Sequence, residues 1–164
     1  MERHIISILV ENQSGVLSRI SGLFSRRGYN IDSLSVGETE DSRFSRITVA
    51  SSGDADVIDQ IIKQLDKLVE SISVVELISG ESVYRELALI KITAETDKRA
   101  EIMGIVDIFR ANIIDVSPSA VIVEMTGETS KIDAFLEIAK PYGILEIART
   151  GLTGLSRGGK AINN

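Results

Sequence analysis

The chain has 164 residues, of which 43% are hydrophobic, and this length and composition favour a globular protein of one ordinary domain or two small ones. Its net charge of −6 and its lack of tryptophan argue against a nucleic-acid binder, which needs a basic surface and aromatic side chains that stack on bases. The absence of cysteine excludes disulfides and thiolate metal sites and fits a cytoplasmic protein, and no apolar run approaches the ~18 residues of a membrane span.

The first half of the chain predicts strands and helices in the order β-α-β-β-α-β. Residues 3–11 are rich in Ile, Val and Leu, as in a buried strand, and a helix follows whose apolar residues recur at helical spacing. Gly28 ends this helix, because glycine adopts the left-handed conformation without a steric penalty. Beyond it we predict strands at 29–37, 43–51 and 71–78, with a second helix between the last two.

The second half repeats this order. The pattern predicts a strand at 84–94, a helix from Asp97 that ends at a left-handed Asn112, strands at 113–116 and 120–125, a helix capped by Thr129 or Ser130, and a strand at 144–149. We therefore predict an α+β fold of two tandem ferredoxin-like βαββαβ units, over residues 1–79 and 80–164. The segment from Gly151 onward has four glycines and few apolar residues, which predicts a flexible tail.

Each predicted unit is small and covers one face of its sheet with two helices. A domain of this size is only marginally stable by itself. The other sheet face and the edge strands therefore favour a partner, and the simplest partner is a second copy of the chain.

The side-chain sets of the common catalytic mechanisms are missing from the sequence. His4 is the only histidine, and its position at the start of a strand favours a surface or capping role. The sequence has no Gly-x-Ser-x-Gly elbow and no phosphate-binding loop, and its carboxylates are scattered over helix faces and turns. We therefore predict that this chain is not catalytic by itself.

One candidate binding site lies where the first helix begins. Asn12 and Ser14 can each accept a hydrogen bond from the free amides of the first turn, and Gly15 exposes the backbone beside them. A helix N-terminus favours a negative group such as a carboxylate. The pattern is consistent with simple helix capping or with a site for a small amino acid, and two capping side chains plus a glycine favour the second interpretation.

The residues around this helix start closely resemble the ACT domain of the small regulatory subunits of acetolactate synthase, also called acetohydroxyacid synthase. The resemblance covers essentially the whole chain. Its motifs are Val10-Glu11-Asn12-Gln13-Ser14-Gly15-Val16-Leu17-Ser18-Arg19, Gly28-Tyr29-Asn30-Ile31-Asp32-Ser33-Leu34, Phe109-Arg110, Ile114-Asp115-Val116, Ala148-Arg149-Thr150-Gly151 and Gly154-Leu155-Ser156-Arg157-Gly158.

This resemblance implies a function. Subunits of that family bind and activate the thiamine-diphosphate catalytic (large) subunit and confer feedback inhibition by valine in branched-chain amino-acid synthesis. Their ACT domains pair side by side as a homodimer, with the effector between protomers. Thiamine diphosphate, Mg and FAD are implied only for the catalytic partner, so no cofactor is expected in this chain.

The implied valine site uses residues from two parts of the chain. The effector's carboxylate meets the amides of Ser14, Gly15, Val16 and Leu17. Asn12 holds the loop and can also contact the ligand. Asn30 of the other protomer accepts a hydrogen bond from the ammonium group. The isopropyl group is buried against Val16, Leu17 and Ile31, which contributes roughly 1.5–3 kcal/mol.

Two other functions share parts of this pattern. A free-standing ACT-type amino-acid sensor, controlling another enzyme or a transcription factor, has the same fold and helix start but not the long C-terminal resemblance. An RNA-recognition module has the same βαββαβ order but needs aromatic residues on its sheet and a basic surface.

Overall fold

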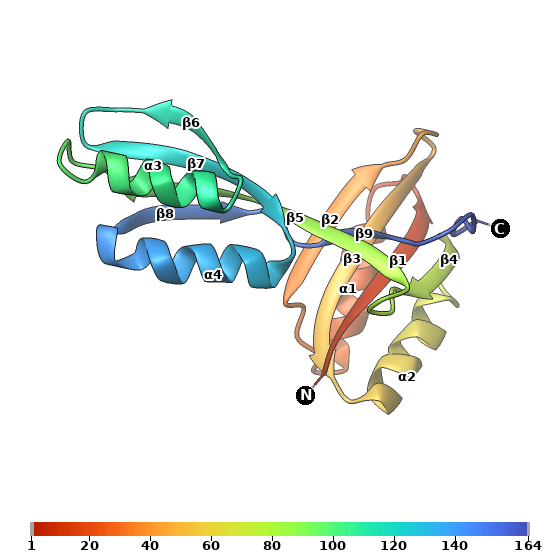
Figure 1. Cartoon of the computed structure of the whole chain (residues 1–164). Coiled ribbons are helices and arrows are strands. Elements are labelled where there is room, and N and C mark those ends of the chain that lie inside the picture. Colours follow the sequence, from red (N-terminus) through yellow and green to blue (C-terminus); the bar gives the residue numbers. More distant parts are fainter. Residues whose placement is uncertain (1, 164) are drawn as a thin grey trace. The chain divides into compact units, whose positions relative to one another are not determined.

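The computed structural model describes residues 2–163 and divides into two compact units (Figure 1). The first unit combines the chain up to Tyr84 with the segment from Gly151 onward, and the second comprises Arg85–Thr150. Among the described residues, none of the helices has the length and apolar character needed to cross a membrane.

The first unit has a four-stranded antiparallel sheet with two helices on one face (Figure 1). The strand order in the sheet is β2-β3-β1-β4. The elements are β1 (Glu2–Glu11), α1 (Val16–Arg26), β2 (Ser33–Glu38), β3 (Phe44–Gly53), α2 (Ala55–Leu65) and β4 (Ser71–Glu76). This is the predicted ferredoxin-like order and topology.

Every second side chain of β1 from Ile6 to Val10 is apolar and contributes to the core of this unit. Ile6, Ile8 and Val10 point to the helix-covered face, because successive strand residues face opposite sides of a sheet. They pack against the apolar faces of α1 and α2, whose buried residues are Val16, Ile20, Leu23, Phe24, Ile58, Ile61 and Leu65. The helical spacing of these residues is the same spacing that predicted the helices from the sequence.

The second unit repeats the fold. Its sheet has the order β6-β7-β5-β8, which is equivalent position by position to that of the first. The elements are β5 (Ser82–Thr93), α3 (Arg99–Ile108), β6 (Asn112–Val116), β7 (Ala120–Gly127), α4 (Thr129–Ala139), a short 3-10 helix (Lys140–Tyr142) and β8 (Ile144–Arg149). The prediction of two tandem ferredoxin-like units is therefore confirmed.

The C-terminal segment differs from the predicted flexible tail. It contains a further strand, β9 (Thr153–Ser156), which pairs with β5, and it belongs to the first unit rather than the second. The glycines allow close packing here, since a Cβ on Gly154 would lie 2.8 Å from the carbonyl oxygen of Val83. The predicted boundary between residues 79 and 80, with the tail assigned to the second unit, therefore does not match the compact units.

The same segment covers part of the first sheet on the face opposite α1 and α2 (Figure 1). Leu152 is only 2% exposed and forms a small second core with Ile5, Ala50 and Leu77. The prediction that this sheet face is left for a partner is thus wrong for the part that the chain's own C-terminal segment covers.

Two helix ends show where local chemistry predicted the backbone and where it did not. Gly28 follows α1 with a φ of +71°, as predicted. After α3 the left-handed residue is Arg110, with a φ of +53°, whereas Asn112 already begins β6. The prediction placed this conformation on Asn112 because Asn tolerates it better than Arg does.

Replacing Arg110 with Gly is expected to stabilise the chain by about 0.5–1 kcal/mol, because glycine removes the steric cost of the left-handed conformation. The exposed Arg110 side chain makes this substitution a test of the backbone alone. The midpoint of urea unfolding measures it. Asn112→Gly, within a strand, is the control and is expected to destabilise.

Candidate functional site

The first turn of α1 has no side-chain cap within the part of the chain that the structure describes. Gly15 is the N-cap residue, with a φ of +87°, and neither Asn12 nor Ser14 accepts a hydrogen bond from the first-turn amides. The predicted capping by these two side chains is therefore wrong. The left-handed N-cap requires glycine or a residue such as Asn or Asp that tolerates this conformation.

Asn12 instead holds the loop between β1 and α1 in place. Its backbone N–H donates to the carbonyl of Arg43 at 2.7 Å. Its side-chain Nδ2 donates to the carbonyl of Ser42 at 2.9 Å and to Oε1 of Glu38 at 3.1 Å. Asn12 thereby joins the start of α1 to the turn between β2 and β3.

The three apolar residues predicted to line the site differ in exposure. Val16 is 4% exposed and packs in the core of the first unit, so its side chain is already enclosed by its own chain. Leu17 is 41% exposed, and Ile31 is partly buried against the same core. Only Leu17 and Ile31 therefore have side-chain surface left for a ligand.

Two charged residues beside the helix start were not singled out from the sequence. Nη2 of Arg19 lies 2.7 Å from Oε1 of Glu70, and it would be 3.8 Å from a Cβ on Gly15. The spacing of four residues between Gly15 and Arg19 was the available signal, because residues four apart share one face of a helix. The Glu70 partner comes from the segment before β4 and has no local signal.

Asn30 lies in a turn that precedes β2 and is held to β3. Its Nδ2 donates to Oδ1 of Asp32 at 2.9 Å, and its carbonyl accepts a hydrogen bond from Oγ of Ser51 at 2.7 Å. The N–H of Asp32 donates to the carbonyl of Ala50 at 2.8 Å. We call residues 30–32 the turn; the strand predicted from residue 29 begins at Ser33 instead.

The helix start and the turn lie at opposite ends of the first sheet. Glu11, just before the helix start, is paired with Phe44, whereas Asn30 is bonded to Ser51 further along the same strand. Strands rise about 3.3 Å per residue, so these ends are about 20 Å apart. One amino-acid ligand therefore cannot contact both Gly15 and Asn30 of the same chain.

His4 is buried rather than on the surface, which corrects its predicted role. It is 9% exposed, and its Nδ1 lies 2.6 Å from Oε1 of Glu76. It pairs across the sheet with Ser51, far from the helix start. The partner on β4 is more than seventy residues away in sequence, so local pattern gave no sign of it.

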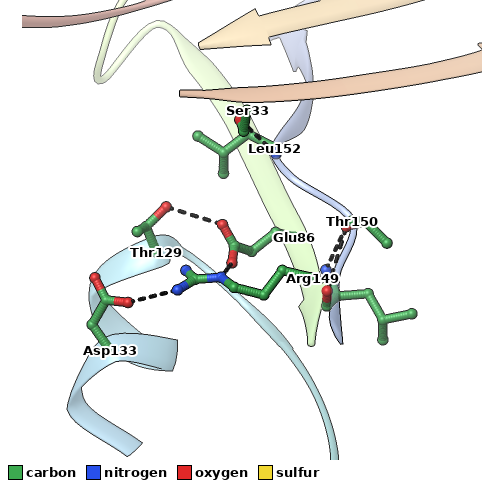
Figure 2. A network of polar contacts seen from close by, with 8 residues as sticks. Ser33, Glu86, Thr129, Asp133, Arg149, Thr150 and Leu152 are labelled. Atoms are coloured by element: carbon green, nitrogen blue, oxygen red, sulfur yellow. Dashed lines mark hydrogen bonds and ion pairs between the residues drawn. The ribbon is translucent and has the colours of Figure 1, made fainter. Parts of the chain in front are cut away.

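The second unit contains an ion-pair network around one buried carboxylate, that of Glu86 (Figure 2). Glu86 is 4% exposed, and its carboxylate accepts hydrogen bonds from Arg149 and Thr129, while Arg149 also donates to Asp133. Burial by itself lowers the pKa of Arg149, but the hydrogen bonds to Glu86 and Asp133 outweigh it and raise that pKa above its usual value. The network ties β8, β5 and α4 together and has a structural role.

Comparison with known proteins defines the class of the chain and then its family. Residues 6–73 match the family model described as an AHAS small subunit-like ACT domain, so the chain is an ACT-domain protein with a second ferredoxin-like unit. Residues 85–158 match the model described as the small subunit of acetolactate synthase. The chain belongs to the family of acetolactate synthase small subunits.

Similar proteins match along nearly the whole chain. A probable acetolactate synthase small subunit from Archaeoglobus fulgidus is 51% identical over 158 residues, covering 96% of this chain and 99% of that protein. The acetolactate synthase small subunit from Bacillus subtilis is 49% identical, and the match covers 95% of this chain and 91% of that protein. The crystal structure of the acetolactate synthase small subunit from Thermotoga maritima has a TM-score of 0.89 at 42% identity and covers 98% of this chain and 100% of that one.

Proposed function

We propose that the chain is a regulatory subunit that binds the catalytic subunit of acetolactate synthase, raises its activity and makes it sensitive to inhibition by valine. Family membership supports the pairing with a catalytic subunit. In this proposal thiamine diphosphate, magnesium and FAD belong to the catalytic subunit. The match of residues 85–158 argues against a free-standing amino-acid sensor.

The main support for a shared effector site is that its two parts, the start of α1 and the turn that holds Asn30, lie far apart within one chain. β2 is an edge strand, so a second copy can pair with it. If two β2 strands pair antiparallel about a two-fold axis, the first residue of one lies beside the last residue of the other. Glu38 is the last residue of β2 and accepts a hydrogen bond from Asn12, which lies just before α1. This pairing therefore brings the beginning of the partner's β2, and with it the partner subunit's Asn30, to the start of α1.

The chemistry of this paired site fits a small aliphatic amino acid. Its carboxylate lies at the first-turn amides of α1, where no side chain of the described residues competes for them, an interaction worth about 0.3–2 kcal/mol. Its ammonium group is bound by the side-chain oxygen of the partner subunit's Asn30. Its isopropyl group lies between Leu17 and the partner subunit's Ile31, while Val16 supports this surface from the core.

Selectivity among valine, leucine and isoleucine rests on the size of that apolar contact. These side chains differ by about one methylene, which changes binding by about 1–3 kcal/mol. We therefore expect partial rather than complete discrimination among the three amino acids.

Reconstitution with the catalytic subunit tests the proposal. Supplied with pyruvate, thiamine diphosphate and magnesium, the purified chain alone is expected to form no acetolactate. Added to the catalytic subunit, it is expected to raise the rate and to introduce valine inhibition, which the catalytic subunit by itself lacks. Turnover by the chain alone, or a catalytic rate that the chain leaves unchanged, contradicts the proposal.

A further inference from the structure

The beginning of the C-terminal segment lies directly against the beginning of β2. Gly151 has a φ of +81°, and a Cβ on it would lie 3.0 Å from Cβ of Ser33 and 3.3 Å from the backbone nitrogen of Leu34. The N–H of Leu152 donates to Oγ of Ser33 at 3.4 Å (Figure 2). Real Cβ atoms rarely approach this closely, so the contact depends on glycine at position 151.

The rest of this segment, residues 152–157, is anchored within the first unit. Leu152 is 2% exposed in the small core with Ile5, Ala50 and Leu77. Gly154 lies against β5, and the N–H of Arg157 donates to the carbonyl of Glu81 at 2.8 Å. We call residues 151–157 the strap. Because the strap is held at several points, we expect a side chain added at Gly151 to displace Ser33.

Ser33 directly follows the turn that holds Asn30. That turn is bonded to β3 through Asp32 and Ala50 and through the carbonyl of Asn30 and Ser51. The strap contacts Ser33, the residue directly after the turn, from a different segment of the chain. The position of Asn30 therefore depends on two segments. β3 is bonded to the turn directly, and the strap lies against Ser33 next to it.

We propose that Gly151 is a positioning residue for effector binding: by holding Ser33, it sets the position in which Asn30 presents its side chain to the effector. This inference rests on the proposed effector site. It adds a role for the C-terminal segment, which lies against Ser33. Displacement of Ser33 would misplace Asn30 and weaken binding without removing any group that contacts the ligand.

The test compares two glycines with the same backbone conformation. Gly158 has a φ of +80° but would meet nothing within 4 Å of an added Cβ. Gly151→Ala is expected to weaken valine binding, measured by calorimetry on the full chain, about tenfold, and Gly158→Ala less than about twofold. Hydrogen exchange at the amides of Asp32 and Leu34 is expected to accelerate in Gly151→Ala only.

Two further variants separate the contact from backbone strain. Ser33→Gly in the Gly151→Ala background removes the two Ser33 side-chain atoms that the new Cβ meets and leaves the contact with the backbone nitrogen of Leu34, so it is expected to restore part of the valine affinity. Ser33→Val enlarges the same contact from the other side without placing a side chain at a positive φ, and it is expected to weaken binding even if Gly151→Ala fails to fold.

Each other result has a defined meaning. Unchanged valine affinity in both Gly151→Ala and Ser33→Val overturns the positioning role and leaves the proposed function standing. A double variant that stays as weak as Gly151→Ala shows that the contact with Ser33 is not the cause and also overturns the role. A natural chain that binds neither valine, leucine nor isoleucine overturns the proposed function, and the positioning role with it.

Discussion

Replacing Gly15 with Asp is expected to weaken valine binding strongly, whereas Gly15→Asn retains most of it. Both side chains tolerate the left-handed conformation that Gly15 adopts, and they have nearly the same size. They differ in charge: the carboxylate of Asp binds to the first-turn amides and repels the carboxylate of the effector. We expect Asp to weaken valine affinity about 30-fold or more relative to Asn, as measured by calorimetry.

Fold and activation serve as controls for this comparison. Both Gly15 variants are expected to keep the circular dichroism of the natural chain and to raise the activity of the catalytic subunit, since α1 keeps its buried face. Equal valine affinity for Gly15→Asp and Gly15→Asn would show that the effector's carboxylate does not lie at the start of α1.

Mixing two defective chains tests whether the site is shared between protomers. Gly15→Asp damages the helix start and Asn30→Ala damages the turn, so neither homodimer has an intact site. In a mixed dimer, the helix start of the Asn30→Ala chain meets the turn of the Gly15→Asp chain, and one site has both parts intact. Co-purified mixed dimers are therefore expected to bind one valine per dimer. No recovery would contradict a site shared between the two protomers.

Replacing Arg149 with Met is expected to destabilise the second unit by about 3 kcal/mol. The side chain of Glu86 is only 3% exposed, and Arg149 supplies its charge partner. Without that partner the carboxylate is left buried and uncompensated, which costs far more than the loss of an exposed pair. Urea unfolding followed by circular dichroism measures the change.

Two variants show whether the buried charge is the cause. Lys63→Met breaks the exposed ion pair with Asp59 on α2 and is expected to shift the unfolding midpoint little. Adding Glu86→Leu to Arg149→Met removes the stranded carboxylate and is expected to recover much of the lost stability. A double variant less stable than Arg149→Met would assign the loss to packing of the Arg149 side chain.

The order of strands and helices could be predicted because each element carries its own periodic signal. Alternating apolar residues in β1 and helical spacing in α1 depend only on neighbours along the chain. The same applies to Gly28, whose left-handed conformation follows from its chemistry. Arg110 shows the limit of such local reasoning, because the path of the chain into β6 placed a less favourable residue in that conformation.

The candidate site was predictable in residue type but not in geometry. The sequence singled out Gly15 and Asn30, but the partners of Asn12 are Glu38 and Ser42, which the folding of β2 against β3 brings to it. Val16 carries an apolar signal that does not distinguish a ligand contact from the core, and in the structure it lies in the core.

By itself the sequence determined the fold class, the internal repeat and the glycine at the start of α1, because hydrophobic periodicity and backbone preference are local properties. The tertiary structure alone decided that the C-terminal segment completes the first unit, that His4 is buried against Glu76, and that Gly15 and Asn30 lie at opposite ends of one sheet. These features depend on contacts between segments far apart in the chain. A glycine-rich segment can be a flexible tail or a closely packed strand. Only the atoms around Gly151 and Gly154 show that this segment is closely packed.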